Sequence, residues 1–244
     1  MSSYTKSSFT FFLVAGILFG GLISLAQTQP TSATSAQSNG FSGIQNIPDL
    51  LERFLGDRGN NNNNPSSGSS ADYLDIDRAV IAADPKKLQA VLQTHGHIPK
   101  DGSGGAFGYG ILTEKGGFDA VMVSTTHKGV KDSVKQTNAN DPVWHNHYIS
   151  LGTNALCGNN PAVKDITFQS PGSIVVNKDR AVMSNMPATF TGTDALTGKK
   201  LTLSPGTDVD NVVSFKLDPK FNAKKELKAV CVTDIRNADI IIGN

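Results

Sequence analysis

WHNHYISL, residues 144–151, alternates polar and apolar side chains in the manner of a β-strand. Because successive side chains of a strand point to opposite faces, His145 and His147 share one face with Ile149 and Leu151. The other face carries Trp144, Asn146 and Tyr148. A histidine pair on an apolar face is expected to point inward, where each imidazole needs a partner. The stretch therefore predicts a β-rich fold with an interior histidine site.

Further segments rich in β-branched residues extend this pattern along the chain. The expected strands are 106–113, 118–125, 143–151, 163–169, 173–176, 181–185, 200–203, 209–217 and 227–234. Turn residues separate them, as in the Pro-Gly pairs at 171–172 and 205–206. The chain lacks the alternation of strands and helices that is typical of parallel sheets. We predict a mainly β fold, an antiparallel sandwich or barrel.

One N-terminal helix is expected to pack at an edge or end of this fold. Asp84 suits the N-cap, and Pro85 suits the first helical position. Apolar residues between Leu88 and Leu92 recur at helical spacing, and Gly96 would end the helix.

The N-terminus is typical of a secretory signal peptide. An uncharged apolar run, 9–25, follows Lys6, and the small residues Ser24 and Ala26 precede the polar Gln27. We expect cleavage after Ala26 and an exported protein, whether periplasmic, secreted or at the cell surface. The alternative is an uncleaved membrane anchor, because the run approaches the roughly 18 to 20 apolar residues that cross a bilayer.

Residues 27–71 are dominated by Ser, Thr, Gln, Asn and Gly, and they are expected to form a flexible polar linker. Such a composition buries too little apolar surface to offset the entropy of ordering it. Within the linker, 48–56 has the spacing of a short amphipathic helix, either a transient helix or a docking peptide. The globular β-rich domain is expected over 72–244, which is long enough for one hydrophobic core.

The charge balance excludes some classes of partner. Removing residues 1–26 takes away one of the 22 basic side chains and none of the 21 acidic ones, so the mature chain has no net charge. Nucleic-acid binding needs a basic excess or stripe, and we do not expect it. The expected partners are a small molecule or metal ion, or a protein that contacts 48–56. Membrane contact is expected only if the signal stays uncleaved.

Cys157 and Cys231 are the only cysteines of the chain. In an exported protein such a pair is expected to form a disulfide, which stabilises the native state by about 4 kcal/mol in the chain-entropy model. The alternative places one or both on a metal ion as thiolates, since Cys157 follows His147 closely.

All five histidines lie between His95 and His147, four of them in two His-x-His pairs. We expect His145 and His147 to bind a transition metal, joined by His97 and by His127 or His95. Each has a structural alternative. His145 and His147 can bond buried backbone or carboxylate groups, His95 can stabilise the end of the expected helix, and His127 fits an exposed loop.

Neutral imidazoles suit Zn, Cu, Ni or Fe, and ligand type alone does not choose among these ions. Three ligands with an open position would permit a metal-dependent lyase or hydrolase that acts on a small polar molecule, whereas four would close the site. The acid/base candidates are Glu114, Asp119 and Asp141. The alternative function is a non-catalytic secreted or periplasmic binding module without a metal.

The His-x-His strand, followed by Ser170-Pro171-Gly172, resembles the first metal-binding segment of the cupins. The glutamate that this segment carries shortly after the pair is absent here, and no histidine follows His147. A His-x-His strand is also similar to part of the zinc site of acetolactate decarboxylases. These resemblances cover a few residues only, so they imply a metal site and assign no family.

Overall fold

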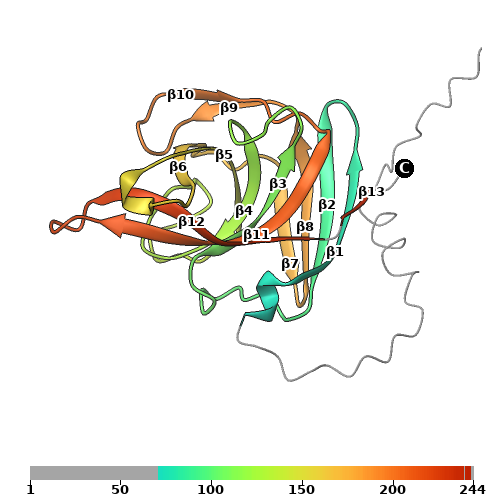
Figure 1. Cartoon of the computed structure of the whole chain (residues 1–244), viewed down its shortest axis with the longest axis horizontal. Helices are drawn as coiled ribbons and strands as arrows, with labels where there is room; N and C mark the ends of the chain where they lie inside the picture. The colour runs from blue at the N-terminus through green and yellow to red at the C-terminus, as the bar shows by residue number, and fades with distance from the viewer. Residues whose placement is uncertain (1–70, 239, 243–244) are drawn as a thin grey trace, which may run out of the picture. The chain divides into compact units, whose positions relative to one another are not determined.

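The computed structural model describes residues 71–238 and 240–242. The expected signal peptide (1–26), the linker up to residue 70 and the helix at 48–56 lie outside the described residues. The described part is mainly β, with a closed six-stranded barrel and a five-stranded sheet that share one core (Figure 1). The prediction of a mainly β barrel or sandwich is confirmed.

The barrel is antiparallel throughout, and its wall is closed by the pairing of its first strand with β11. In order around the wall, its strands are β3 (Phe107–Thr113), β4 (Val121–Thr126), β5 (His145–Gly152), β6 (Ala162–Ile166), β12 (Leu227–Asn237) and β11 (Val209–Phe221). The expected strands 106–113 and 118–125 correspond to β3 and β4, which pair with each other as a hairpin.

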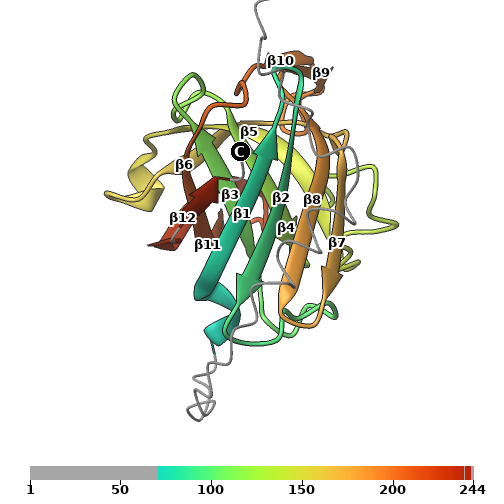
Figure 2. The same cartoon turned by 90° about the vertical axis from the view of Figure 1, so that its right-hand side faces the viewer.

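The five-stranded sheet lies against one side of the barrel, as Figure 2 shows with the sheet in front. Its order is β13 (Ile240–Ile242), β1 (Ile76–Ala83), β2 (Lys87–Thr94), β8 (Arg180–Pro187) and β7 (Ser173–Asn177), and only the β13–β1 pair is parallel. The remaining elements are the hairpin of β9 (Phe190–Thr193) and β10 (Lys200–Leu203) and the 3-10 turns η1 (Asp72–Leu74) and η2 (Ala155–Cys157).

Two hydrophobic clusters pack against opposite faces of the barrel wall, one outside the barrel and one inside it. The main core lies between the wall and the sheet, and it includes Phe107, Tyr109, Trp144, Tyr148, Leu88, Leu92 and Met183. The second core lies inside the barrel and includes Val121, Val123, Ile149, Val213 and Phe215. The alternation of β5 explains this division, because Tyr148 points outward into the first core and Ile149 inward into the second.

The prediction of a helix after Asp84 is wrong, because Lys87–Thr94 forms strand β2. The Asp84 carboxylate accepts hydrogen bonds from the backbone N–H groups of Lys86 and Lys87 at 2.7 and 3.0 Å, and it thereby caps the turn between β1 and β2. Leu88 and Leu92 are also an even number of residues apart, so both face the core in a strand. The described residues contain no α-helix, and hence none able to cross a membrane.

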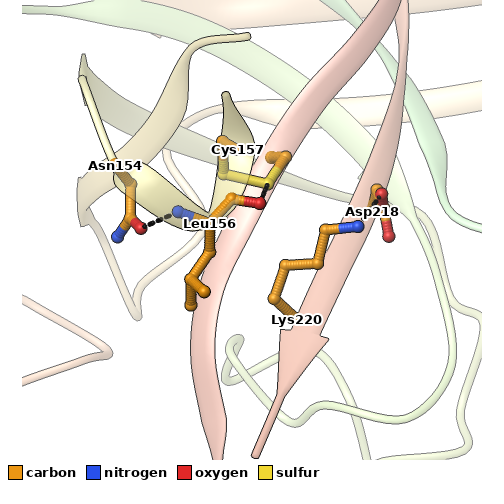
Figure 3. The surroundings of a disulfide bond; sticks show 6 residues. Asn154, Leu156, Cys157, Asp218 and Lys220 are labelled. Atoms are coloured by element: carbon orange, nitrogen blue, oxygen red, sulfur yellow. Dashed lines mark hydrogen bonds and ion pairs between the residues drawn. A yellow bond between two sulfur atoms is a disulfide. The ribbon is translucent and has the colours of Figure 1, made fainter. Parts of the chain in front are cut away.

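The predicted disulfide between Cys157 and Cys231 is confirmed, with a Cα–Cα distance of 5.4 Å (Figure 3). The thiolate–metal alternative is therefore wrong. The bond crosses the weakest seam of the barrel, because β6 and β12 are joined by one register pair, Ala162 with Cys231. The N–H of Val232 also donates to the carbonyl of Pro161 at 2.8 Å.

Candidate metal centre

Three histidines and one aspartate meet inside the barrel. His127 follows β4 directly, His145 and His147 lie at the start of β5, and Asp132 lies in the loop between these strands. One potential ligand atom from each residue lies within 4.8 Å of the other three. The histidines are buried and Asp132 is nearly so, hence the group is largely shielded from water.

The register of two neighbouring strands brings the histidines together. His145 lies opposite Thr125 and His147 opposite Val123 in the β4–β5 ladder. The side chain of Val123 belongs to the core inside the barrel, so Thr125 and, one step further, His127 are expected on the same side. His145 and His147 on β5 and His127 directly after β4 therefore point toward the same part of the barrel interior.

Backbone contacts orient the two imidazoles of β5. Nδ1 of His145 lies 2.7 Å from the carbonyl oxygen of Val143, and Nδ1 of His147 lies 2.6 Å from that of Thr167. Because a carbonyl oxygen only accepts hydrogen bonds, each Nδ1 must carry the hydrogen. In a neutral imidazole the lone pair is then on Nε2, the atom that faces the cluster. Histidine ligands of metals are commonly held by such second contacts.

The Asp132 carboxylate faces all three Nε2 atoms. Its Oδ2 lies 3.1 Å from His127, and its Oδ1 lies 3.3 Å from His145 and 3.6 Å from His147. Neither Oδ1 of Asp132 nor Nε2 of His147 has a hydrogen-bond partner among the described residues, although both atoms are buried. Buried polar atoms without partners are rare and costly, and here lone pairs face each other. A cation between them would remove the conflict.

Burial and the neighbouring groups shift the pKa values of two residues of the cluster in opposite senses. Burial lowers the pKa of His145, the carboxylate of Asp132 opposes this effect, and the neighbouring His147 reinforces it. Burial alone would raise the pKa of Asp132, but its contacts with His127, His145 and His147 outweigh burial and hold that pKa well below its usual range. The cluster thus offers a carboxylate and, at His145, a neutral nitrogen donor.

The spacing of the donors fits a small divalent ion. Bonds from zinc to nitrogen or oxygen are about 2.0 to 2.1 Å long, and a tetrahedron with such bonds has edges of about 3.3 to 3.4 Å. The distance from Oδ2 of Asp132 to Nε2 of His127, 3.1 Å, and the distances from Oδ1 to His145 and His147, 3.3 and 3.6 Å, lie near this value, and all four ligand atoms lie within 4.8 Å of one another. Imidazole and carboxylate are both common ligands of divalent transition metals. We therefore regard the group as a candidate metal centre.

The buried side chain of Gln136 shapes the loop that carries Asp132. Its Oε1 accepts from the N–H groups of Asp132 at 3.0 Å and Ser133 at 3.2 Å. Its Nε2 donates to the carbonyl oxygens of Val130 at 3.1 Å and Asp141 at 3.3 Å. One amide thus ties both sides of the loop together and fixes the backbone at Asp132.

A cavity of about 300 Å³ lies inside the barrel beside the cluster. Thr125, His127, Asp132 and His147 line one part of it, and most of the remaining wall is apolar. The wall also includes the exposed residues Lys128, Leu196 and Lys228, so the cavity extends toward the surface there. A bound ion would therefore have a space beside it into which a ligand fits.

His95 and His97, the other predicted ligands, are exposed and do not belong to the group. His95 instead lies 3.3 Å from the carboxylate of Asp75 and 3.6 Å from that of Asp77. The structure groups His127, and not the expected His97, with His145 and His147. Both residues follow β2 of the sheet, whereas the cluster lies inside the barrel.

The three acid/base candidates lie elsewhere. Glu114 and Asp119 are exposed in the β3–β4 connection, at the opposite end of that hairpin from His127. The carboxylate of Asp141 accepts from the N–H groups of Thr137 at 2.9 Å and Val143 at 3.1 Å, as a turn-forming residue does. None of the three is among the residues that line the cavity.

Asp132 is the acidic residue at the cluster, and the sequence-based prediction missed it. Asp132 lies between Lys131 and Ser133, a sequence that is typical of any polar loop. The only sequence feature that points to Asp132 is its position between His127 and His145.

No family model, curated protein or solved structure matches this chain. Its function is therefore inferred from the residues of the site themselves.

Proposed function

We propose that this is an exported β-domain protein that binds one divalent transition-metal ion through His127, His145, His147 and Asp132. The observation that carries the proposal is the pair of buried atoms, Nε2 of His147 and Oδ1 of Asp132, that face each other at 3.6 Å without hydrogen-bond partners. Zn, Cu, Ni and Fe all suit this donor set. Export is supported by the signal-like N-terminus and by the disulfide, a bond typical of oxidising compartments.

The enzymatic form of this proposal is a metal-dependent lyase or hydrolase that acts on a small molecule. Because four ligands close a tetrahedral site, this form requires the ion to expand to five-coordinate, and the fifth ligand would enter from the cavity that His127, His147 and Asp132 line. An ion placed there would supply Lewis-acid polarisation or a metal-bound hydroxide. The residues of the chain would hold the ion, exclude bulk water and confine the substrate.

The alternative is a metal-free secreted or periplasmic binding module. In that case a proton on an imidazole, and not a metal ion, would balance the Asp132 carboxylate. The 3.1 Å distance between Nε2 of His127 and Oδ2 of Asp132 is the observation that favours this version, since it is compatible with an ion pair.

Metal analysis of the full chain, purified without an affinity tag, tests the proposal. The protein is loaded with each candidate ion and passed through a desalting column, and its metal content is then measured by elemental mass spectrometry. We expect about one ion per chain, as for a single four-ligand site. His145→Ala and His147→Ala are expected to lose the ion, because each removes an inward ligand.

His95→Ala and His97→Ala are the matched controls, because they remove exposed histidines outside the group. They are expected to keep the wild-type metal content. X-ray absorption of the loaded wild type, with imidazole scattering from three histidines expected, gives a second measurement that does not depend on folding of a variant. Wild-type protein without bound metal, or unchanged metal content in both strand-β5 variants, would refute the proposal.

A further inference from the structure

We propose that the barrel cavity binds a small carboxylate with an apolar body, its carboxylate on the metal ion and its hydrocarbon part inside the barrel. This inference rests on the metal site proposed above. It adds the chemical class of the ligand, and it replaces the expected polar molecule with an amphipathic one.

The lining of the cavity divides into two chemically different parts. The polar part consists of Thr125, His127, Asp132 and His147. The apolar part includes Val123, Ile149, Val163, Ile166, Phe215 and Leu217. A volume of about 300 Å³ is at the lower limit of small-molecule pockets. A ligand that fills this space without leaving buried polar groups unpaired has one polar head and a compact apolar body.

The charges around the polar part favour an anionic head. A divalent ion and the Asp132 carboxylate together leave one positive charge, and neutral imidazoles add none. Asp132 is the only acidic residue among those that line the cavity, whereas Lys128 and Lys228 also line it. Lys228 is paired with Glu226 at 3.0 Å, and the charge of Lys128 also acts on Asp101, so the ion would supply most of the positive field. A carboxylate oxygen is, in addition, a common ligand of divalent ions.

The backbone bonds of the two β5 histidines also support a ligand on this side. These bonds fix the Nδ1 side of both imidazoles, and His147, whose buried Nε2 has no hydrogen-bond partner among the described residues, is one of the residues that line the cavity. An ion bound to this atom would sit between the rigid β5 strand and the cavity. The head of a ligand in the cavity would then meet the ion, and its body would meet the apolar wall.

Calorimetric titration of the metal-loaded full chain with hexanoate tests this inference. Acetate has the same head without the body, and hexanol has the body without the carboxylate. We expect hexanoate to bind at least about tenfold more tightly than either, because burial of its methylene groups adds to ligation of the head. With Co(II) as the probe ion, hexanoate is expected to change the visible absorption spectrum by entering the coordination sphere.

Val163→Phe fills part of the cavity without changing a metal ligand. We expect it to weaken hexanoate binding by about tenfold while the metal content stays at the wild-type value. Leu217→Phe, from another strand of the wall, is the second cavity-filling variant, in case the first one does not fold. Val175→Phe is the matched control, because Val175 is 60% exposed on β7 and lies outside the barrel.

Measuring the metal content first separates the two possible failures. Wild-type protein that takes up no ion refutes the proposed function and this inference with it. Protein that takes up the ion but binds hexanoate no more tightly than acetate refutes only the ligand class. Hexanoate binding that is equally strong after removal of the ion also refutes the placement of the carboxylate on the metal.

Discussion

Single side chains outside the ligand set position the cluster, and Gln136 is the clearest of them. Its amide bonds the backbone at Asp132 and Ser133 and so fixes the approach of the carboxylate to the histidines. We expect Gln136→Ala to weaken metal binding by about tenfold, the usual effect of losing an outer-shell contact. Competition with a chromophoric chelator measures this affinity.

Gln136→Glu keeps the oxygen that accepts both N–H groups, so it is expected to recover part of the affinity that Gln136→Ala loses. Lys135→Ala is the control, because Lys135 is an exposed neighbour in the same loop. An unchanged affinity in Gln136→Ala would show that the loop holds Asp132 in place without this amide.

A substitution at Asn146 can test fold stability apart from the proposed metal binding, because Asn146 lies between His145 and His147 on β5 but faces the opposite side. Its Oδ1 accepts from the hydroxyl of Ser124 at 2.5 Å, and its Nδ2 donates to the carbonyl of Pro171 at 2.8 Å. Asn146→Ala leaves these buried partners unsatisfied, so we expect a loss of about 2 kcal/mol in the free energy of unfolding. Urea unfolding of the metal-free protein measures this loss.

The metal content of folded Asn146→Ala is expected to match the wild type, since the substitution leaves all four ligands in place. A variant of full stability, or one that is folded yet lacks metal, would contradict this division of the strand into two faces.

Among the elements, the seam between β6 and β12 depends most on a covalent bond. One register pair joins these strands, whereas seven join β3 to β11. The double variant Cys157→Ala, Cys231→Ala is expected to lose about 4 kcal/mol of unfolding free energy in the chain-entropy model. Denaturant unfolding measures the loss, and reduced wild-type protein should show the same value.

Hydrogen exchange can show whether the loss of stability in the double variant is located where β6 and β12 pair. The Val232 amide, which donates to Pro161 across this seam, is expected to exchange faster in the double variant. Amides of the β3–β4 ladder, which is far better paired, should be less affected. Uniform acceleration across the barrel would instead show that the disulfide acts on global stability alone.

In the folded domain, the proposed metal binding would be linked to folding, because the candidate ligands come from β5 and from the loop that joins β4 to β5. Unfolding separates them, so an ion that binds only the native state stabilises it by about 2.7 kcal/mol at a concentration of 100 times Kd. For a domain of this size we expect a rise in Tm of about 5 to 10 °C. Thermal unfolding with and without the ion measures the rise.

A chelator should reverse this rise, and His147→Ala should abolish it. A Tm that does not respond to any of the four candidate ions would contradict the linkage.

The chain crosses between sheet and barrel several times, and this arrangement limits what the sequence can reveal. β1 and β2 belong to the sheet, β3 to β6 to the barrel, β7 and β8 again to the sheet, and β11 and β12 to the barrel. Strand patterns predicted most of the barrel, because alternation and turn residues are local signals. They missed β1, β9 and β13 and misassigned β2. Leu88 and Leu92 satisfy both the helical and the strand period, and only pairing with β1 and β8 decides between them.

The β class of the fold, the disulfide pair and the inward face of His145 and His147 could be predicted from the amino-acid sequence, because each depends on residue type or on local alternation. The fold was needed to show that His127 and Asp132 complete the cluster and that His97 does not. Convergence of the ligands depends on strand register and on the course of the 127–145 connection, which are set by packing between segments that are distant along the chain.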